Sequence, residues 1–205
     1  PDHYPVEPGA RLASMRIGPL VTKEEHIARM EALCASRPLL RLLPYRARRV
    51  GVIITGSEVY SGRIQDKFES VARGKLARYP AEIVDVAICD DDLDMLTGAA
   101  RRMLDAGADM LLFHGGMSVD PDDLTPTAIR ALGAEIVTYG IPAQPGNMSL
   151  AAYLGDAVIL GVPSSAISNR TSMLDVMLPQ AFTDERFTKD ELTNLGAGGL
   201  CQQCK

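Results

Sequence analysis

Glycines, hydroxyls and carboxylates gather in a loop at residues 114–126, which reads His-Gly-Gly-Met-Ser-Val-Asp-Pro-Asp-Asp-Leu-Thr-Pro. A glycine pair such as Gly115–Gly116 can turn successive backbone N–H groups toward one point, which makes an anion-binding nest. Ser118 adds a hydroxyl, and the carboxylates Asp122 and Asp123 suit a phosphate that is bridged by Mg²⁺. We therefore predict a phosphate-binding loop. His114 ends an apolar run, and we interpret it as a packed, hydrogen-bonded residue and not as a catalyst.

A second loop holds three adjacent carboxylates, Asp90, Asp91 and Asp92. Neighbouring carboxylates repel one another, so they need a helix N-terminus, water or a cation. The cap of a following helix explains one or two of the three. We predict that Asp90 is the functional member.

Two further loops contain small and hydroxyl residues. Thr55-Gly56-Ser57-Glu58 lets backbone approach a ligand closely, although an ordinary tight turn explains it equally well. Pro163-Ser164-Ser165 offers donors to an anion, or it caps the helix that follows. Both readings of each loop stay open at this point.

Alternating apolar runs and helical spacings position these four loops. Strands are predicted at 50–55, 83–88, 110–113, 135–138 and 157–160, and helices at 66–79, 92–104, 125–132 and 166–181. This alternation predicts an α/β fold, a three-layer (αβα) sandwich with a mostly parallel sheet. Ligands of such sheets bind outside the carboxyl ends of the strands.

Three zones divide the chain. Residues 1–48 form a small N-terminal appendage and linker, with a strand expected at 13–17 and a helix at 23–35. Residues 49–183 form the α/β domain, and residues 184–205 a C-terminal helix and a cysteine-containing tail. Because the chain opens on Pro1, we interpret it as a fragment of a longer protein.

Composition excludes several function classes. The net charge of −5 argues against a nucleic-acid binder, which usually has a basic excess. The longest uncharged stretch, 136–155, contains Pro142 and Pro145, so we expect no membrane partner. Four cysteines at these spacings form no disulfide framework, which favours a cytoplasmic protein. Cys201 and Cys204 have the spacing of half a zinc or iron–sulfur site, but free tail thiols explain them equally well.

Taken together, the loops resemble the molybdopterin-binding domain family, with its MoaB/Mog-type adenylyltransferases, its molybdotransferases and gephyrin. Thr55-Gly56-Ser57-Glu58 is similar to the family's Thr-Gly-Asp-Glu turn, with Ser57 where Asp is usual. His114-Gly115-Gly116 is similar to its Thr/Ser-Gly-Gly signature, and Asp123-Leu124-Thr125-Pro126 to the adenylyltransferases' Asp-Val-Thr-Pro. Gly62 with Asp66, and Asp90 with Asp91, also match family motifs.

The resemblance implies a ligand and roles for the loop residues. The ligand is molybdopterin, a pyranopterin with a dithiolene and a terminal phosphate, or its nucleotide form made from ATP, which leaves AMP on the pterin. Asp90 and Asp123 correspond to the acidic pair that is catalytic and binds Mg²⁺. The residues expected to contact the ligand are Thr55, Gly56, Ser57, Glu58, Gly115, Gly116, Met117, Ser118, Pro163, Ser164 and Ser165. A homo-oligomer, trimer or dimer, is also implied.

Two departures from the family pattern bear on activity. Asn147 replaces a phosphate-facing lysine, and Ser164-Ser165 replaces a loop with a ligand-facing glycine. We therefore expect binding of the pterin phosphate with weak or no turnover. Both roles, an enzyme of the pathway and a carrier or sensor of molybdenum cofactor, stay open at this point. The alternative is a nucleotide pyrophosphatase of the competence-damage-inducible type, which cleaves ADP-ribose.

Overall fold

The structure is a computed structural model that describes the chain except residues 1–2, 15, 17, 20, 37–38, 119, 121–122 and 198–205. It divides into two compact units, Pro1–Pro44 and Tyr45–Lys205. The first unit contains α1 (Glu24–Ser36), which confirms the predicted helix and buries none of its residues. The strand expected at 13–17 was wrong for its described members 13, 14 and 16, because an extended segment is stable only when a neighbouring strand pairs with it.

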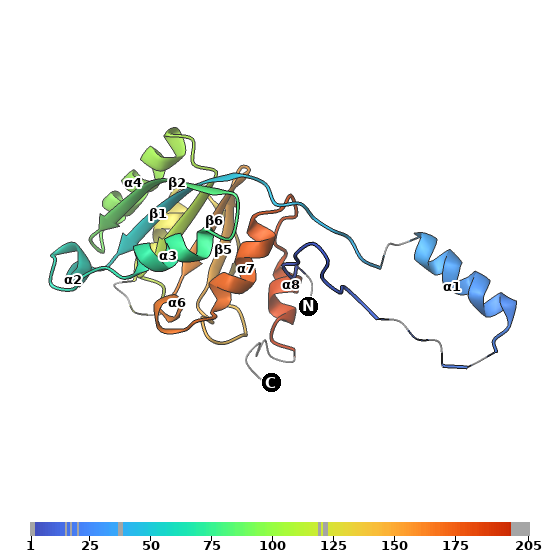
Figure 1. Cartoon of the computed structure of the whole chain (residues 1–205). Helices are drawn as coiled ribbons and strands as arrows, with labels where there is room; N and C mark the ends of the chain where they lie inside the picture. The colour runs from blue at the N-terminus through green and yellow to red at the C-terminus, as the bar shows by residue number, and fades with distance from the viewer. Residues whose placement is uncertain are drawn as a thin grey trace. The chain divides into compact units, whose positions relative to one another are not determined.

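A six-stranded sheet forms the centre of the second unit, in the order β2-β1-β3-β6-β5-β4 (Figure 1). The strands are β1 (Arg48–Thr55), β2 (Ala81–Cys89), β3 (Met110–His114), β4 (Glu135–Tyr139), β5 (Leu150–Leu154) and β6 (Ala157–Val162). The neighbours β2, β1, β3 and β6 run parallel, whereas β5 and β4 each run antiparallel to the strand before them in the sheet. The mostly parallel sheet is therefore confirmed.

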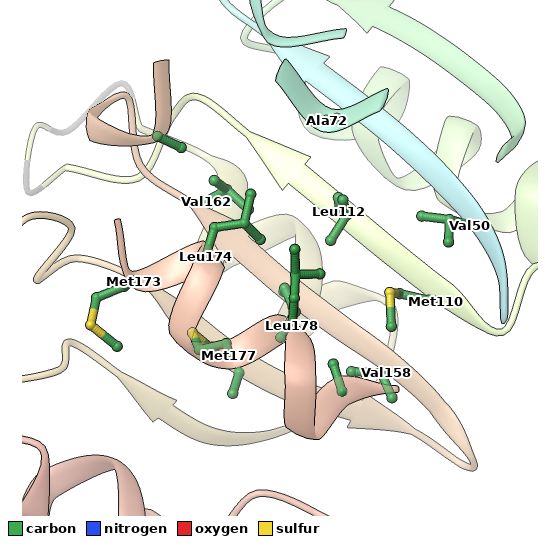
Figure 2. Packing of buried hydrophobic residues seen from close by; sticks show 14 of the residues in the cluster. Val50, Ala72, Met110, Leu112, Val158, Val162, Met173, Leu174, Met177 and Leu178 are labelled. Atoms are coloured by element: carbon green, nitrogen blue, oxygen red, sulfur yellow. The ribbon is translucent and has the colours of Figure 1, made fainter. Parts of the chain in front are cut away.

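Helices cover both faces of this sheet, which confirms the three-layer α/β fold (Figure 1). One face packs against α3 (Phe68–Leu76), α6 (Ser165–Ser168), α7 (Met173–Ala181) and α8 (Lys189–Asn194). The other face packs against α4 (Leu93–Asp105) and α5 (Thr125–Ala131). In the first core, Leu174 of α7 lies beside Val162 of β6, and Leu178 of α7 faces Leu112 of β3 (Figure 2). Burying one leucine side chain contributes about 1.5–3 kcal/mol, so these contacts hold α7 on the sheet.

Strand β5 was missing from the sequence prediction. Its residues Leu-Ala-Ala-Tyr-Leu include no β-branched side chain, so the strand signal is weak. Pairing with β6 supplies what the local sequence lacks, with Leu150 opposite Gly161 and Leu154 opposite Ala157. Because β5 begins beside the end of β6, the segment 140–149 lies at the same edge of the sheet as the carboxyl ends of the parallel strands.

The predicted closing helix at 166–181 was wrong in its continuity, because it is broken into α6 and α7. Asn169 adopts an extended backbone, and Ser172 begins α7 with a capping box. The Asp175 carboxylate accepts hydrogen bonds from the N–H and the hydroxyl of Ser172, at 2.8 and 3.2 Å. Ser172-x-x-Asp175 is a sequence signal for a helix start that would have located this break.

Candidate functional site

Four parallel strands end side by side at one edge of the sheet. Thr55 of β1 lies beside Cys89 of β2, and Ile54 lies beside His114 of β3, which is in turn beside Val162 of β6. Neighbouring strands are about 4.8 Å apart, so the three steps from β2 to β6 span roughly 14 Å. The structure thus brings the loops after all four strands, which contain the predicted site residues, to a single edge.

The acidic turn after β2 is tied to the turn after β1 by hydrogen bonds. The Thr55 hydroxyl donates to Oδ1 of Asp91 at 2.7 Å, and the Ser57 N–H donates to Oδ2 of Asp91 at 3.1 Å. Both oxygens of Asp91 are therefore used to hold the two turns together. Asp92 caps α4 by accepting from the Met95 N–H at 2.8 Å, which confirms the predicted cap within this triplet.

Asp90 differs from its two neighbours. Its Oδ1 accepts hydrogen bonds from the Ser57 hydroxyl at 2.5 Å and from the Asp91 N–H at 2.9 Å. These two donors, the Ser57 hydroxyl first, hold the pKa of the Asp90 carboxyl below its usual value. No hydrogen bond from the described residues reaches its Oδ2. The group is thus an ionised carboxylate with one oxygen available to a cation or an external donor.

The Gly115–Gly116 turn packs directly against the end of β1. Both residues have positive φ angles, 92° and 56°. A Cβ on Gly115 would lie 2.3 Å from the Thr55 carbonyl oxygen, and one on Gly116 would lie 2.8 Å from Oγ1 of Thr125. The backbone path therefore requires glycine at both positions, whatever the loop binds.

Three successive backbone N–H groups follow in this loop, those of Gly116, Met117 and Ser118. Within the part of the chain that the structure describes, none of them donates to a protein acceptor. The Met117 side chain is buried against Gly161 of β6, so Met117 can meet a ligand only through its backbone. Ser118 is exposed. These N–H groups, which bond to no described residue, are available to water or to a bound anion.

Asp123 interacts electrostatically with Tyr139, the last residue of β4. Its N–H donates to the Asp120 carbonyl at 3.0 Å, and its buried Oδ2 has no hydrogen-bond partner among the described residues. Burial first, and the Asp123 charge second, raise the pKa of the Tyr139 hydroxyl. Asp122 lies outside the described residues. No contact joins Asp123 to Asp90, so their joint action stays a prediction.

The loop after β6 lies against the turn at 145–147. A Cβ on Gly146 would lie 3.1 Å from the Ser165 hydroxyl, and the Met173 N–H donates to the Pro145 carbonyl at 3.0 Å. The Ser165 hydroxyl is buried without a partner in the described chain, and Ser164 starts α6 without a side-chain cap bond. Capping by Ser164 therefore does not explain this loop.

The remaining predicted residues are less informative. Pro163 is half-buried, and Glu58, in the short helix α2 (Ser57–Tyr60), is exposed and makes no side-chain hydrogen bond to a described residue. Gly56 precedes α2 with a φ of 145° and open space around it. Cys201 and Cys204 lie outside the described residues. Among the residues that are described, no three His, Cys, Asp or Glu side chains are grouped to hold a metal ion.

His114 is a packed residue, as predicted. Its ring stacks on Phe68 with centroids 3.9 Å apart, and its Nδ1 lies 3.1 Å from the Val162 carbonyl oxygen. Burial lowers its pKa to about 4, so the imidazole is neutral at physiological pH. In this neutral state the His114 ring links β3 to β6 through the Val162 carbonyl, and it adds no charge to the site.

Comparison with known proteins identifies the domain. A family model described as a probable molybdopterin binding domain matches residues 51–183, well over half of the chain. The chain belongs to this family. The match begins inside β1 and ends just after α7, so it includes every loop of the edge described above.

Solved structures share the fold of this molybdopterin-binding domain. The MoaB protein of Thermus thermophilus is 24% identical, with a TM-score of 0.53 over 64% of this chain and 90% of that one. The tungsten cofactor synthesizing protein MoaB of Pyrococcus furiosus is 20% identical, with a TM-score of 0.58 over 68% and 95%. A CinA-like protein of Mycobacterium tuberculosis is 32% identical over 90 residues, 43% of this chain. That match spans only 21% of the mycobacterial protein.

No helix among the described residues is long and apolar enough to cross a membrane.

Replacing Gly115 with alanine should sharply destabilise the domain. The positive φ costs about 1–2 kcal/mol for any other residue, and displacing the Thr55 carbonyl adds about 1–3 kcal/mol. Gly155→Ala is the matched control, because Gly155 also has a positive φ, 59°, but nothing within 4 Å. Urea denaturation should show a markedly larger loss of unfolding free energy for Gly115→Ala than for Gly155→Ala. Equal losses would mean that contact with Thr55 does not constrain the loop.

The buried His114 should make stability depend on pH. In the unfolded chain the imidazole binds a proton near pH 6.5, but in the folded protein it does so only near pH 4. The unfolded state therefore holds more protons in this window, and His114 destabilises the fold by up to about 3 kcal/mol as pH falls from 6.5 to 4. His114→Phe, which keeps the ring stack on Phe68, should flatten this part of the stability profile. A variant profile parallel to that of the wild type would contradict the assignment.

Proposed function

We propose that the carboxyl edge of this sheet binds the phosphate of molybdopterin, or of its nucleotide form, in the biosynthesis or handling of molybdenum cofactor. The observation that carries the proposal is the run of N–H groups at Gly116, Met117 and Ser118 that donate to no described residue. Such donors stabilise an anion without needing a charged side chain. Membership of the molybdopterin-binding family supports a pterin phosphate as the source of that anion.

Mg²⁺ is part of the proposal, with Asp90 and Asp123 as its protein ligands. Each carboxylate has one oxygen, Oδ2, that takes no hydrogen bond from the described residues. Mg²⁺ is typically held by one or two carboxylates with substrate phosphates and water completing its shell, so two protein carboxylates are enough for such a site. When bound, the ion would neutralise phosphate charge. The chain's own part is to hold Asp90 ionised, through Ser57 and Asp91.

Turnover by this chain is proposed to be weak. Adenylyl transfer needs cationic stabilisation of the reacting oxygens, and loss of one such contact typically costs ~10²–10³ in rate. The exposed Asn147 supplies no charge at the turn beside Ser165. This favours the reading of the domain as a binding module, a carrier or a sensor, over that of an efficient adenylyltransferase or molybdotransferase.

A cytoplasmic setting and self-assembly complete the proposal. Cys34 and Cys89 are free thiols, which is typical of a reducing compartment. The pair Cys201 and Cys204 would bind zinc or an iron–sulfur cluster only with ligands from elsewhere. The trimer or dimer is proposed from the family resemblance alone.

The alternative function is hydrolysis of ADP-ribose, and the similarity to CinA-like proteins favours it. A direct test separates the two. We expect mass spectrometry to find a pterin phosphate on protein purified from a host that makes molybdenum cofactor, and added ADP-ribose to displace it poorly. Release of AMP from ADP-ribose, without any bound pterin, would establish the pyrophosphatase instead.

Replacing Asp90 with asparagine should remove the Mg²⁺-dependent part of phosphate-ligand binding. Asparagine keeps the size and an oxygen that accepts from Ser57, but it lacks the charge that attracts a cation. We expect Mg²⁺-dependent affinity for AMP, measured by calorimetry with and without Mg²⁺, to fall at least about tenfold. Asp156→Asn is the control, since Asp156 is exposed in the turn between β5 and β6 at the opposite edge. Equal affinities for both variants would remove Asp90 from the proposed metal site.

A further inference from the structure

Two hydroxyl groups from different elements hold carbonyl oxygens of the loop after β3. Thr125, the first residue of α5, donates from Oγ1 to the Gly115 carbonyl at 2.8 Å. Tyr139, the last residue of β4, directs its hydroxyl to the carbonyls of Ser118 and Met117, at 2.8 and 3.1 Å. Neither contact was visible in the sequence, because a hydroxyl side chain gives no local sign of which carbonyl it will reach.

These contacts determine where the loop's N–H groups point. In a trans peptide the C=O and the N–H of one plane point in opposite directions. The Gly115 carbonyl shares a peptide plane with the Gly116 N–H, and the Met117 carbonyl shares one with the Ser118 N–H. Turning each carbonyl toward its hydroxyl therefore turns the matching N–H away from it. These are two of the three N–H groups for which the described part of the chain supplies no acceptor.

We propose that Thr125 and Tyr139 are positioning residues that orient the Gly116 and Ser118 N–H groups toward a bound phosphate. This inference rests on the proposed function of the loop, and it assigns the orientation of the donors to two side chains that do not touch the ligand. Thr125 holds the plane that contains the Gly116 N–H, and Tyr139 holds the plane that contains the Ser118 N–H, so separate side chains orient the two donors.

The surroundings suit this role. Thr125 is fully buried, so water does not replace its hydroxyl at the Gly115 carbonyl. Tyr139 is half-buried, and burial together with the Asp123 charge raises the pKa of its hydroxyl. The phenol thus keeps its proton, and donates it, at physiological pH. A phosphate dianion accepts two or more hydrogen bonds, which matches a pair of N–H groups held in one loop.

The test uses ¹⁵N-labelled protein titrated with inorganic phosphate, with the amide proton shifts of Gly116 and Ser118 as the readout. In the wild type both amides should move as phosphate binds. Tyr139→Phe should abolish the response of Ser118 and keep that of Gly116, whereas Thr125→Val should do the reverse. Each variant should bind phosphate about tenfold more weakly, the effect of losing one hydrogen bond to a charged group. Thr125→Ser keeps the hydroxyl and should restore the wild-type response.

The outcomes separate this inference from the proposed function. If neither amide of the wild type responds to phosphate, the proposed phosphate loop itself is wrong. If both respond and remain responsive in Tyr139→Phe, the positioning role is overturned while phosphate binding stands. A merely structural role would weaken both responses together in every variant. Tyr139→Phe alone decides the matter if Thr125→Val fails to fold, because the partly exposed phenol hydroxyl is the easier of the two to remove.

Discussion

The close approach of the Gly115–Gly116 backbone to Thr55 is the contact on which the whole edge depends. Thr55 ends β1, and its side chain faces two neighbours at once. Its methyl group lies under the glycine turn after β3, and its hydroxyl donates to the Asp91 carboxylate after β2. One buried residue thus joins three strand ends. A bulkier side chain in the glycine turn would push that loop off the edge and disturb the acidic turn with it.

Charge at the edge is divided in a way that suits a phosphate held through a cation. Asp90 and Asp91 concentrate negative charge after β2, while the loop after β3 presents N–H groups. Ser57 follows β1, which lies between β2 and β3, and the resemblance to the family's Thr-Gly-Asp-Glu turn would place an aspartate there. A third carboxylate there would lie within hydrogen-bond distance of the other two and would repel both, whereas the serine hydroxyl donates to Asp90 at 2.5 Å. The substitution therefore lowers the repulsion within the turn and reduces the charge available to a cation.

Most of the architecture was predictable from the sequence because the strands and helices have strong local patterns. The buried parallel strands β1 and β3 are continuous apolar runs, and α4 places its apolar residues on one face. Strand β5 was not predictable, because only its pairing with β6 makes Leu-Ala-Ala-Tyr-Leu a strand. The break between α6 and α7 was predictable, since Ser172-x-x-Asp175 marks a helix start.

The candidate site was predicted less completely than the fold. The four loops were located correctly at the strand ends, since topology alone brings them to one edge. The division of labour among the carboxylates was predicted only in part: the cap was expected, but nothing in the sequence showed that Asp91 would hold the two turns together. Tyr139 had no local signal at all. It lies at the end of β4, far along the chain from Met117 and Ser118, and only the tertiary structure shows that its hydroxyl reaches their carbonyls.

The glycine turn also determines what a comparison of homologous sequences can reveal about ligand binding. Gly115 and Gly116 are required by the packing on Thr55 and Thr125 whether or not anything is bound. Selection for folding alone would preserve them, so their persistence in a lineage says nothing about retained binding. The side chains of Ser118 and Asp90 are not constrained in this way, because packing of the core does not need them. Lineages that lose the ligand while keeping the fold are free to vary these two residues first, and drift there with an intact glycine pair would mark the loss of function.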